Sequence, residues 1–402
     1  MNLTEELEWR GLINQSTFED IDVLNGDPIK FYWGVDPSAD SMTIGNLASA
    51  MLVKHFIAHG HEAILLVGGA TGLIGDPDGK KDERNLKARD EIEHNKAAIL
   101  KQYSRIFSGE KFNTVDNFDW FKDINFIDFL TTIGKHVPMN QMLARGFVQS
   151  RLETTGISFA EFTYSLIQAF DFLHLFREHG VTLQLCGGDQ WGNSTAGVSL
   201  IRRIEGSEAN VFTTPLVVNK ATGVKFGKSE NGAIWLDAAK TTVFEFNQFW
   251  LNVSDDSVID FLKIFTMLDR AVIEDLEVEV SERPWKRAAQ KVLAHEVTLL
   301  VHGAERTREV EEAQHALFGG LKLTELSPEA LEMLVGEVGS VHLNQRLTAA
   351  LVASHLASSV SDARRLMANG GVSVDGEKVF EDIEITGLSL VKKGKNQFVI
   401  VR

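Results

Sequence analysis

The chain is poor in cysteine, in long apolar runs and in basic residues. Cys186 is the only cysteine among 402 residues, which excludes an intramolecular disulfide and a thiolate metal cluster. No run reaches the roughly 18 apolar residues that span a bilayer, and the first residues have neither the basic start nor the apolar run of a secretion signal. The sequence therefore predicts a cytoplasmic protein with no membrane partner.

Lysine and arginine number 40 against 56 acidic residues, and the formal net charge is −16. This balance argues against indiscriminate nucleic-acid binding, which depends on neutralising phosphates. Specific binding through a local basic surface stays open. The 44% hydrophobic and 24% charged residues are ordinary for a soluble globular protein, and a chain of this length should divide into two or three domains.

The residues from Phe31 to Leu47 predict a strand ending at Val35, a turn, and a helix from about Ile44 to His59. A helix entered this way points unsatisfied N–H groups and the positive end of its dipole at the loop, so it favours an anion such as phosphate. Gly45 leaves room either for a flat ligand near the backbone or for a close helix packing contact. The alternative interpretation is an ordinary crossover in an α/β domain.

A second glycine-rich segment, residues 68–84, follows a predicted apolar strand at residues 63–67. Glycines at the carboxyl end of a strand let the backbone approach a ligand. The segment does not match the dinucleotide fingerprint, and Ile74 stands where a P-loop needs its first glycine. Lys80, Lys81 and Arg84 are either solvated or placed to close over a reacting group.

The most informative helix begins at Ser158, which with Glu161 predicts a capping box. Tyr164, Gln168 and Asp171 follow at positions i, i+4 and i+7, so they line one stripe of an otherwise apolar helix. A buried phenol, amide and carboxylate must find partners or destabilise the fold. They form either a satisfied internal network or a polar pocket, and we favour the pocket because three such groups exceed what a core usually tolerates.

Two later loops also carry polar residues. A predicted strand at residues 182–185 runs into residues 186–193, where glycines and Asp189 offer a place for a ribose or an ammonium group. Residues 215–218 predict a further strand, which leads through a turn to residues 225–229 with their two lysines. Thr222 stands where a P-loop needs its first glycine, so we reject that motif. Two cations beside the helix N-terminus at Gly45 would hold a triphosphate from both ends.

The last part of the chain changes character. Residues 241–318 are mostly helical by period, and from about residue 343 the sequence turns to short helices, a hairpin at residues 372–379 and a terminal strand. In residues 343–402, eight basic residues are set against six acidic ones, a balance of +2 in a chain of −16. This contrast indicates either a basic face suited to RNA or a solvated surface.

With these motifs laid out, the chain resembles bacterial tyrosyl-tRNA synthetase along nearly its whole length. Residues 32–47, 67–77, 184–193 and 225–229 match that family in order and spacing. The resemblance implies an α/β fold with a Rossmann-like parallel-sheet catalytic domain, an α-helical domain, a small α+β RNA-binding domain and a homodimer. The implied parts are a catalytic domain at 1–215, a lysine signature loop and linker at 216–242, a helical tRNA-binding domain at 243–320, a linker at 321–342 and an RNA-binding domain like that of a small-subunit ribosomal protein at 343–402.

The resemblance also implies the reaction. The carboxylate of L-tyrosine attacks the α-phosphorus of ATP, pyrophosphate leaves, and the adenylate passes its acyl group to tRNA(Tyr). No protein nucleophile is required, so catalysis rests on positioning and on cations that meet charge developing at the phosphates. Mg²⁺ would accompany the ATP, and no tightly bound metal held by the protein is expected.

Residue roles follow from the resemblance by position. Tyr32 and Asp171 match the pair that hydrogen-bonds the substrate phenol. The rest of the tyrosine would be held by Asp76, Tyr164, Gln168 and Gln190. ATP would be held by Gly34, Asp36, Ser38, Thr43, Gly45, Asn46, Gln184, Gly187, Asp189, Lys225, Lys228 and Ser229. The catalytic residues would be Thr43, Lys80, Arg84, Lys225 and Lys228, and the RNA-binding residues Arg364, Arg365, Lys392, Lys393 and Lys395.

Two positions depart from the family, and three alternatives stay open. Thr43 stands where the family has histidine, and its hydroxyl can donate to a phosphate oxygen but lacks the reach and charge of imidazole; Trp33 replaces a small residue beside the ribose. The alternatives are a paralogue that has lost adenylation and acts as an RNA-binding or regulatory protein, a tryptophan-specific enzyme, and a small-molecule adenylyltransferase. Tyr32 and Asp171 argue against a tryptophan-specific enzyme, and the basic C-terminal part argues against a small-molecule adenylyltransferase.

Overall fold

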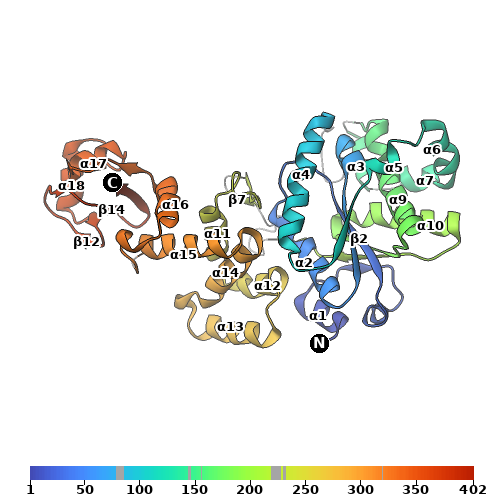
Figure 1. Ribbon diagram of the computed structural model, residues 1–402, viewed down its shortest axis with the longest axis horizontal. Coiled ribbons are helices and arrows are strands. Elements are labelled where there is room, and N and C mark those ends of the chain that lie inside the picture. Colours follow the sequence, from blue (N-terminus) through green and yellow to red (C-terminus); the bar gives the residue numbers. More distant parts are fainter. Residues whose placement is uncertain (78–85, 144–145, 155, 219–227, 230–231, 319) are drawn as a thin grey trace. The chain divides into compact units, whose positions relative to one another are not determined.

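The structure is a computed structural model that describes residues 1–77, 86–143, 146–154, 156–218, 228–229, 232–318 and 320–402 (Figure 1). The chain divides into two compact units. The first comprises Met1–Thr241 and Trp250–Val301, and the second comprises Thr242–Phe249 and His302–Arg402. The five-part division inferred from the sequence stays a prediction.

The first unit is built on a six-stranded sheet with the order β1-β6-β5-β2-β3-β4. Its parallel strands are β2 (Lys30–Val35), β3 (Glu62–Val67), β4 (Phe112–Asp116), β5 (Leu183–Gly187) and β6 (Asn210–Thr214), and the short β1 (Gln15–Ser16) pairs antiparallel with β6. The parallel order confirms the predicted Rossmann-like class. β3 lies between β2 and β4, and its apolar run is buried, as expected for a strand covered on both faces.

Helices cover both faces of this sheet, and successive residues of β2 show how. Phe31 packs on Phe56 of α2 with ring centroids 5.5 Å apart, whereas the next residue, Tyr32, packs on Phe172 of α9 at 5.3 Å. Alternate residues of a strand face opposite sides, so α2 and α9 lie on different faces. The helices of this unit are α1 (Leu3–Arg10), α2 (Ile44–Ala58), α3 (Gly69–Ile74), α4 (Arg89–Ile106), α5 (Phe118–Phe121), α6 (Phe126–Thr132), α7 (Met139–Leu143), α8 (Gly146–Leu152), α9 (Phe159–His179), α10 (Trp191–Glu205), α12 (Asp255–Phe265), α13 (Arg270–Glu282) and α14 (Ala288–His302).

The second unit holds a smaller, five-stranded sheet with the order β12-β11-β14-β15-β9. Val391 and Val399 pack on one face with α17 and α18, and Leu390 and Ile400 pack on the other with α15 and α16. The predicted hairpin forms, with its turn at Asp375 and Gly376. The elements are α11 (Val243–Leu251), α15 (Ala304–Phe318), α16 (Pro328–Val338), β9 (Ser340–Val341), β10 (Gln345–Arg346), α17 (Leu347–Ala353), α18 (Val360–Ala368), β11 (Val372–Val374), β12 (Glu377–Lys378), β13 (Glu384–Ile385), β14 (Ser389–Lys393) and β15 (Gln397–Val401).

Two local predictions are wrong. Residues 215–217 form no strand, because β6 already ends at Thr214 and Pro215 has no N–H to extend the ladder. The capping box at the start of α9 is only half made. Ser158 Oγ accepts from Glu161 N at 3.3 Å, but the Glu161 carboxylate lies 3.0 Å from Arg151 Nη2, and both side chains are buried. A buried arginine requires a counter-charge, so the ion pair takes the carboxylate away from the cap.

Candidate active site

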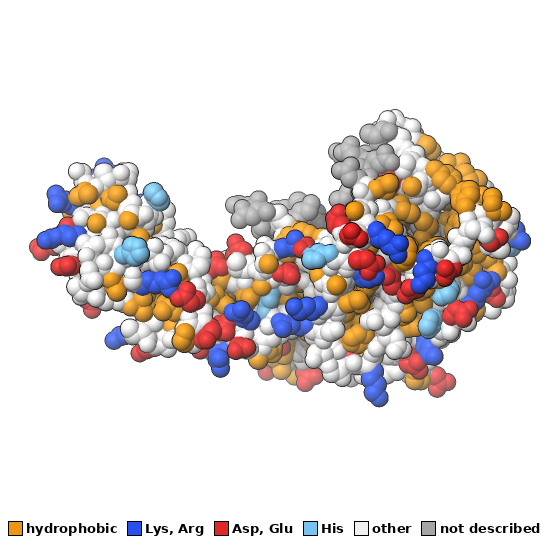
Figure 2. Space-filling model, turned by 45° about the horizontal axis from the view of Figure 1, so that its top comes forward, with side chains coloured by type: hydrophobic (Ala, Val, Ile, Leu, Met, Phe, Trp, Pro, Cys, Tyr) orange, Lys and Arg blue, Asp and Glu red, His pale blue; other side chains and the backbone are white. Residues whose placement is uncertain are grey.

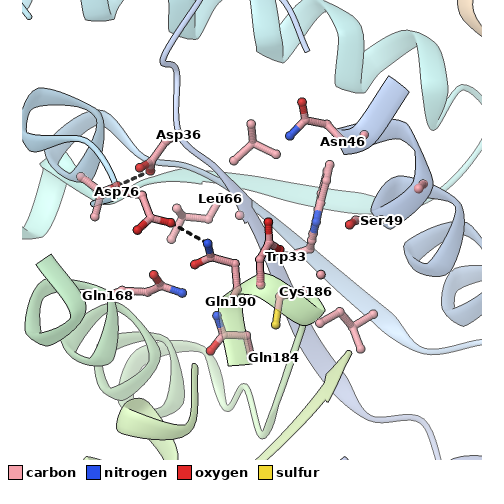
Figure 3. Close-up of a pocket in the computed structure, with 18 of the residues that line it drawn as sticks. Trp33, Asp36, Asn46, Ser49, Leu66, Asp76, Gln168, Gln184, Cys186 and Gln190 are labelled. Atoms are coloured by element: carbon pink, nitrogen blue, oxygen red, sulfur yellow. Dashed lines mark hydrogen bonds between the residues drawn. The ribbon is translucent and has the colours of Figure 1, made fainter. Parts of the chain in front are cut away.

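A cavity of about 310 Å³ lies at the carboxyl ends of β2 and β5 (Figure 3), where open α/β sheets bind ligands. It brings together most of the residues predicted from the sequence. Those that line it are Tyr32, Gly34, Asp36, Ser38, Thr43, Gly45, Asn46, Asp76, Tyr164, Gln168, Asp171, Gln184, Gly187, Asp189 and Gln190. Lys80, Arg84 and Lys225 lie outside the described residues, as do the side chains of Lys228 and Ser229.

Tyr32 and Asp171 form a buried polar pair that lines this cavity. No described residue hydrogen-bonds the buried Tyr32 hydroxyl, and burial, with the nearby Asp171 carboxylate, raises the pKa of Tyr32 well above its usual range. Asp171 accepts from Asn117 Nδ2 at 3.0 Å and from Trp120 Nε1 at 2.9 Å. Burial nevertheless raises the pKa of Asp171 to about 8, because the two donors only partly replace the lost solvent.

A second network holds Asp36 at the end of β2. Its carboxylate accepts from the Tyr164 hydroxyl and from Thr71 Oγ1, both at 2.6 Å. Thr71 Oγ1 in turn accepts from Asn117 Nδ2 at 3.0 Å, so Asn117 links Asp36 to Asp171. Sequence reasoning missed Thr71, Asn117 and Trp120. The one available signal was a polar pair, Asp116 and Asn117, at the carboxyl end of a strand.

Asp76 and Gln190 form a third group on the cavity wall. Gln190 Nε2 donates to Asp76 Oδ2 at 2.6 Å, the contact drawn as a dashed line in Figure 3. Asn193 Nδ2 donates to Gln190 Oε1 at 3.1 Å, which orients the Gln190 amide. Gln168 also lines the cavity. The three side chains could therefore receive a cationic group.

The N-terminus of α2 opens directly into the cavity. Asn46 Oδ1 accepts from Thr43 N at 2.9 Å and from Thr43 Oγ1 at 3.0 Å, which fixes the first turn. A Cβ added to Gly45 would meet only Thr43 Oγ1, at 3.5 Å, so no neighbouring helix requires this glycine. Of the two interpretations of Gly45, the structure favours room for a ligand.

The glycines after β3 lie against carboxylates of the protein itself. A Cβ on Gly68 would lie 2.1 Å from Asp36 Oδ1, and one on Gly69 would lie 2.2 Å from Asp116 Oδ1. These glycines make room for carboxylates of the protein itself. The predicted approach of this backbone to a ligand stays a prediction, and residues 69–74 form helix α3 instead of a loop.

The segment with the signature lysines is tied to the cavity at both flanks. Upstream, Pro215, Leu216 and Val217 line the cavity. Downstream, Lys228 of β7 (Lys228–Ser229) pairs with Ala233 of β8 (Gly232–Ala233). The next residue, Ile234, accepts a hydrogen bond from Ile44 N at 3.2 Å. The chain therefore leaves the cavity at residue 217 and returns to the start of α2 at residue 234.

The predicted RNA-binding residues lie in the second unit. Arg364 and Arg365 are exposed on α18, where Arg365 pairs with Asp362 at 2.8 Å. Lys392 and Lys393 are neighbours on β14 and so face opposite sides of the sheet; Lys395 lies in the following turn. The two β14 lysines do not share a face, and RNA binding by these residues stays a prediction.

The described residues contain neither a cluster of metal-ligating side chains nor a helix that could span a membrane. Within that part of the chain, no set of three or more His, Cys, Asp or Glu side chains is placed to hold a metal ion. The helices there include none that is long and apolar enough to cross a membrane.

Comparison with known families accounts for nearly the whole chain. The family described as tRNA synthetases class I (W and Y) matches residues 24–319. The chain is thus a class I tRNA synthetase by fold and by the position of its cavity. A second family, described as the tyrosine–tRNA ligase SYY-like C-terminal domain, matches residues 330–402.

Individual relatives indicate which kind of class I tRNA synthetase this chain is similar to. The tyrosine–tRNA ligase of Bacillus caldotenax is 45% identical to this chain, over 100% of this chain and 100% of the relative. The tyrosine–tRNA ligase of Limosilactobacillus fermentum is 44% identical, over 100% of this chain and 97% of the relative. A crystal structure of a C-terminally truncated mitochondrial tyrosyl-tRNA synthetase from Aspergillus nidulans is similar with a TM-score of 0.71 and 31% identity, covering 79% of this chain and 94% of that one. The chain belongs to the tyrosine–tRNA ligase family, which confirms the resemblance found in the sequence.

Proposed function

We propose that this protein activates L-tyrosine with ATP to tyrosyl-adenylate and then transfers the tyrosine to the 3′ end of tRNA(Tyr). The observation that carries the proposal is the buried Tyr32 hydroxyl, which lacks a partner among the described residues and lines the same cavity as Asp171. A substrate phenol would pair with both groups. Phenylalanine would leave the Tyr32 hydroxyl buried and unsatisfied, which is unfavourable, so the same pair selects the substrate.

The other groups of the cavity suit the rest of the reaction. Asp76, oriented by Gln190, would hold the substrate ammonium group together with Gln168. The nucleotide phosphates would lie at the N-terminus of α2 near Gly45, where backbone donors favour anions. Mg²⁺ would enter on the ATP phosphates as part of the substrate. Alignment of the tyrosine carboxylate with the α-phosphorus then lowers the barrier.

The flanks of the lysine segment support its proposed role on the leaving pyrophosphate. Lys228 lies across a two-residue ladder from Ala233, and Ile234 is bonded to Ile44. Paired and consecutive Cα atoms are each separated by about 4–5.5 Å, so the Lys228 Cα lies no more than roughly 15 Å from the start of α2. A cation tethered there would meet negative charge at the departing phosphates.

We also propose a homodimer in the cytoplasm. Seven described large apolar side chains between residues 126 and 159 are exposed, and orange side chains gather over the region of α6 and α7 in Figure 2. They are Phe126, Ile127, Leu130, Met139, Leu143, Leu152 and Phe159. Exposed apolar surface of this kind marks an association site, and a second copy of the chain would cover it. The cytoplasmic location rests on the single cysteine.

Exchange of pyrophosphate into ATP tests the proposed activation step. The purified protein should catalyse exchange that depends on tyrosine, with little or none supported by phenylalanine or tryptophan. Charging of a bacterial tRNA(Tyr) transcript then tests transfer. Exchange supported by tryptophan alone would overturn the substrate assignment, and a complete lack of exchange would overturn the activity. Thr43→His, measured beside the wild type, should raise the exchange rate because imidazole adds reach and charge toward the phosphates.

A further inference from the structure

Trp285 is the most exposed large apolar side chain among the described residues. Its exposed fraction is 75%, compared with 73% for the next, Leu86. No described residue makes a ring contact with the Trp285 indole or places a cation over it. Tryptophan is normally well buried in folded proteins, so this exposure is not explained by folding.

The turn that carries Trp285 is held firmly between α13 and α14. Pro284, Trp285 and Lys286 form a single 3₁₀ turn, in which Lys286 N donates to Arg283 O at 3.0 Å and Arg287 N donates to Pro284 O at 3.0 Å. The Arg287 guanidinium donates to the backbone carbonyls of Leu251 and Val253. The indole is therefore presented outward by an ordered turn, since a frayed end would lack these bonds.

The turn that carries the indole is rich in cations, although the chain as a whole is acidic. Residues 283–287 contain Arg283, Lys286 and Arg287 and no acidic residue, whereas the end of α13 before the turn carries Glu279 and Glu282. Lys286 and Arg283 are about half exposed, and both lie within 4 Å of Glu279. An exposed aromatic ring flanked by cations matches the way in which proteins bind unpaired nucleotides.

We propose that Trp285 is a stacking platform for an unpaired base of the bound tRNA, with the adjacent cations contacting the neighbouring phosphates. This inference rests on the proposed function, which supplies tRNA as the substrate. A base has a flat face that covers an indole whatever its identity, so the contact adds affinity without reading sequence. A protein partner fits less well, because Trp285 stands alone among charged neighbours in its turn, unlike the apolar residues of segment 126–159.

Trp285→Ala and Trp285→Phe test the platform by tRNA binding across a series of salt concentrations. The alanine variant should bind a bacterial tRNA(Tyr) transcript at least about fivefold more weakly, with an unchanged slope of log affinity against log salt, because no phosphate contact is lost. The phenylalanine variant should keep most of the affinity. Lys286→Ala should instead lower the salt slope by about one. Val278→Ala, at another exposed apolar residue on α13, is the matched control and should bind like the wild type.

Tryptophan emission gives a second measurement. Stacking should quench the fluorescence of Trp285 when tRNA is added. The Trp285→Phe variant retains the other six of the seven tryptophans, so its emission should lack the decrease that comes from Trp285. Tyrosine-dependent exchange is measured on the same samples. If the wild type lacks exchange, the proposed function fails. If exchange and tRNA binding are normal but Trp285→Ala binds like the wild type, the platform is wrong. If Trp285→Ala changes the oligomeric state, the indole belongs to a protein–protein contact and the platform is also wrong.

Discussion

At the scale of single residues, the cavity depends on polar groups that are buried before any substrate arrives. Tyr164, Gln168 and Asp171 were predictable because a helical period places them on one stripe. Their partners were not, since Asn117 and Trp120 follow β4, far away in the sequence. Such groups destabilise the empty protein and become useful when a ligand satisfies them.

Replacing Tyr32 by phenylalanine should separate stability from activity. The variant removes a buried hydroxyl that has no described partner, so its unfolding free energy should rise by about 1 kcal/mol. Its kcat/KM for tyrosine in the exchange assay should fall about tenfold, because the substrate phenol loses a hydrogen bond. Thermal unfolding and exchange kinetics measure the two effects.

Tyr103→Phe is the matched control for this prediction. The Tyr103 hydroxyl is also buried, but it donates to Leu66 O at 3.1 Å and does not line the cavity. Its loss should lower stability and leave the kinetics for tyrosine unchanged. Equal loss of stability in both variants would contradict the assignment of Tyr32 as an unsatisfied group.

Asp171→Asn should change how stability depends on pH. The pKa of Asp171 is raised from 3.8 to about 8, so between these values the folded protein holds a proton that the unfolded chain releases. Stability from this group is therefore lost as pH rises through that interval. Asparagine does not titrate, so the melting temperature of the variant minus that of the wild type should increase between about pH 5 and about pH 8. A difference that stays flat or shrinks would refute the raised pKa.

At the scale of elements, helix starts were predicted better than the contacts they make. The beginnings of α2 and α9 agree with the sequence signals at residues 44 and 158. The side chain expected to complete the α9 cap, Glu161, pairs instead with Arg151, which comes from α8. A local pattern therefore locates a helix end, whereas buried charges from other elements decide which polar partners are used.

Asn46→Ala should weaken the N-terminus of α2. The variant removes the acceptor for both Thr43 N and Thr43 Oγ1, which should cost about 1 kcal/mol of stability, as the loss of a capping group does. Because the first turn then no longer holds its donors in place, KM for ATP should rise while KM for tyrosine changes little. Exchange kinetics with each substrate varied in turn measure this split, and an equal rise in both KM values would count against it.

At the scale of the whole molecule, the sequence indicated several domains, and the structure divides into two compact units. The helical stretch from residue 241 to 318 was recognised by its period. The period did not indicate how these helices are divided between the two units. The helices α12 to α14 belong to the first unit, and α15 belongs to the second. Helical period reports which residues are buried, but not which neighbour buries them.

Phe159→Asp should disrupt the proposed dimer. Phe159 is the first residue of α9 and is 65% exposed, so an acidic replacement there suits the helix dipole and should leave the fold intact. A charge buried in an apolar interface should weaken association at least about tenfold, since an unpaired charge resists desolvation. Sedimentation equilibrium measures it. Phe380→Asp, at a 60% exposed phenylalanine of the second unit, should have no effect.

The sequence by itself determined the strand–loop–helix order, the helix starts and the polar stripe of α9, because these depend on local period and on capping groups. It also carried the family, through four motifs that keep their order and spacing. Only the tertiary structure decided that Asn117 joins Asp36 to Asp171, that Gly68 and Gly69 accommodate carboxylates, and that Ile234 returns the chain to α2. Those contacts join residues far apart in the chain, and their geometry is set by how the sheet and helices pack.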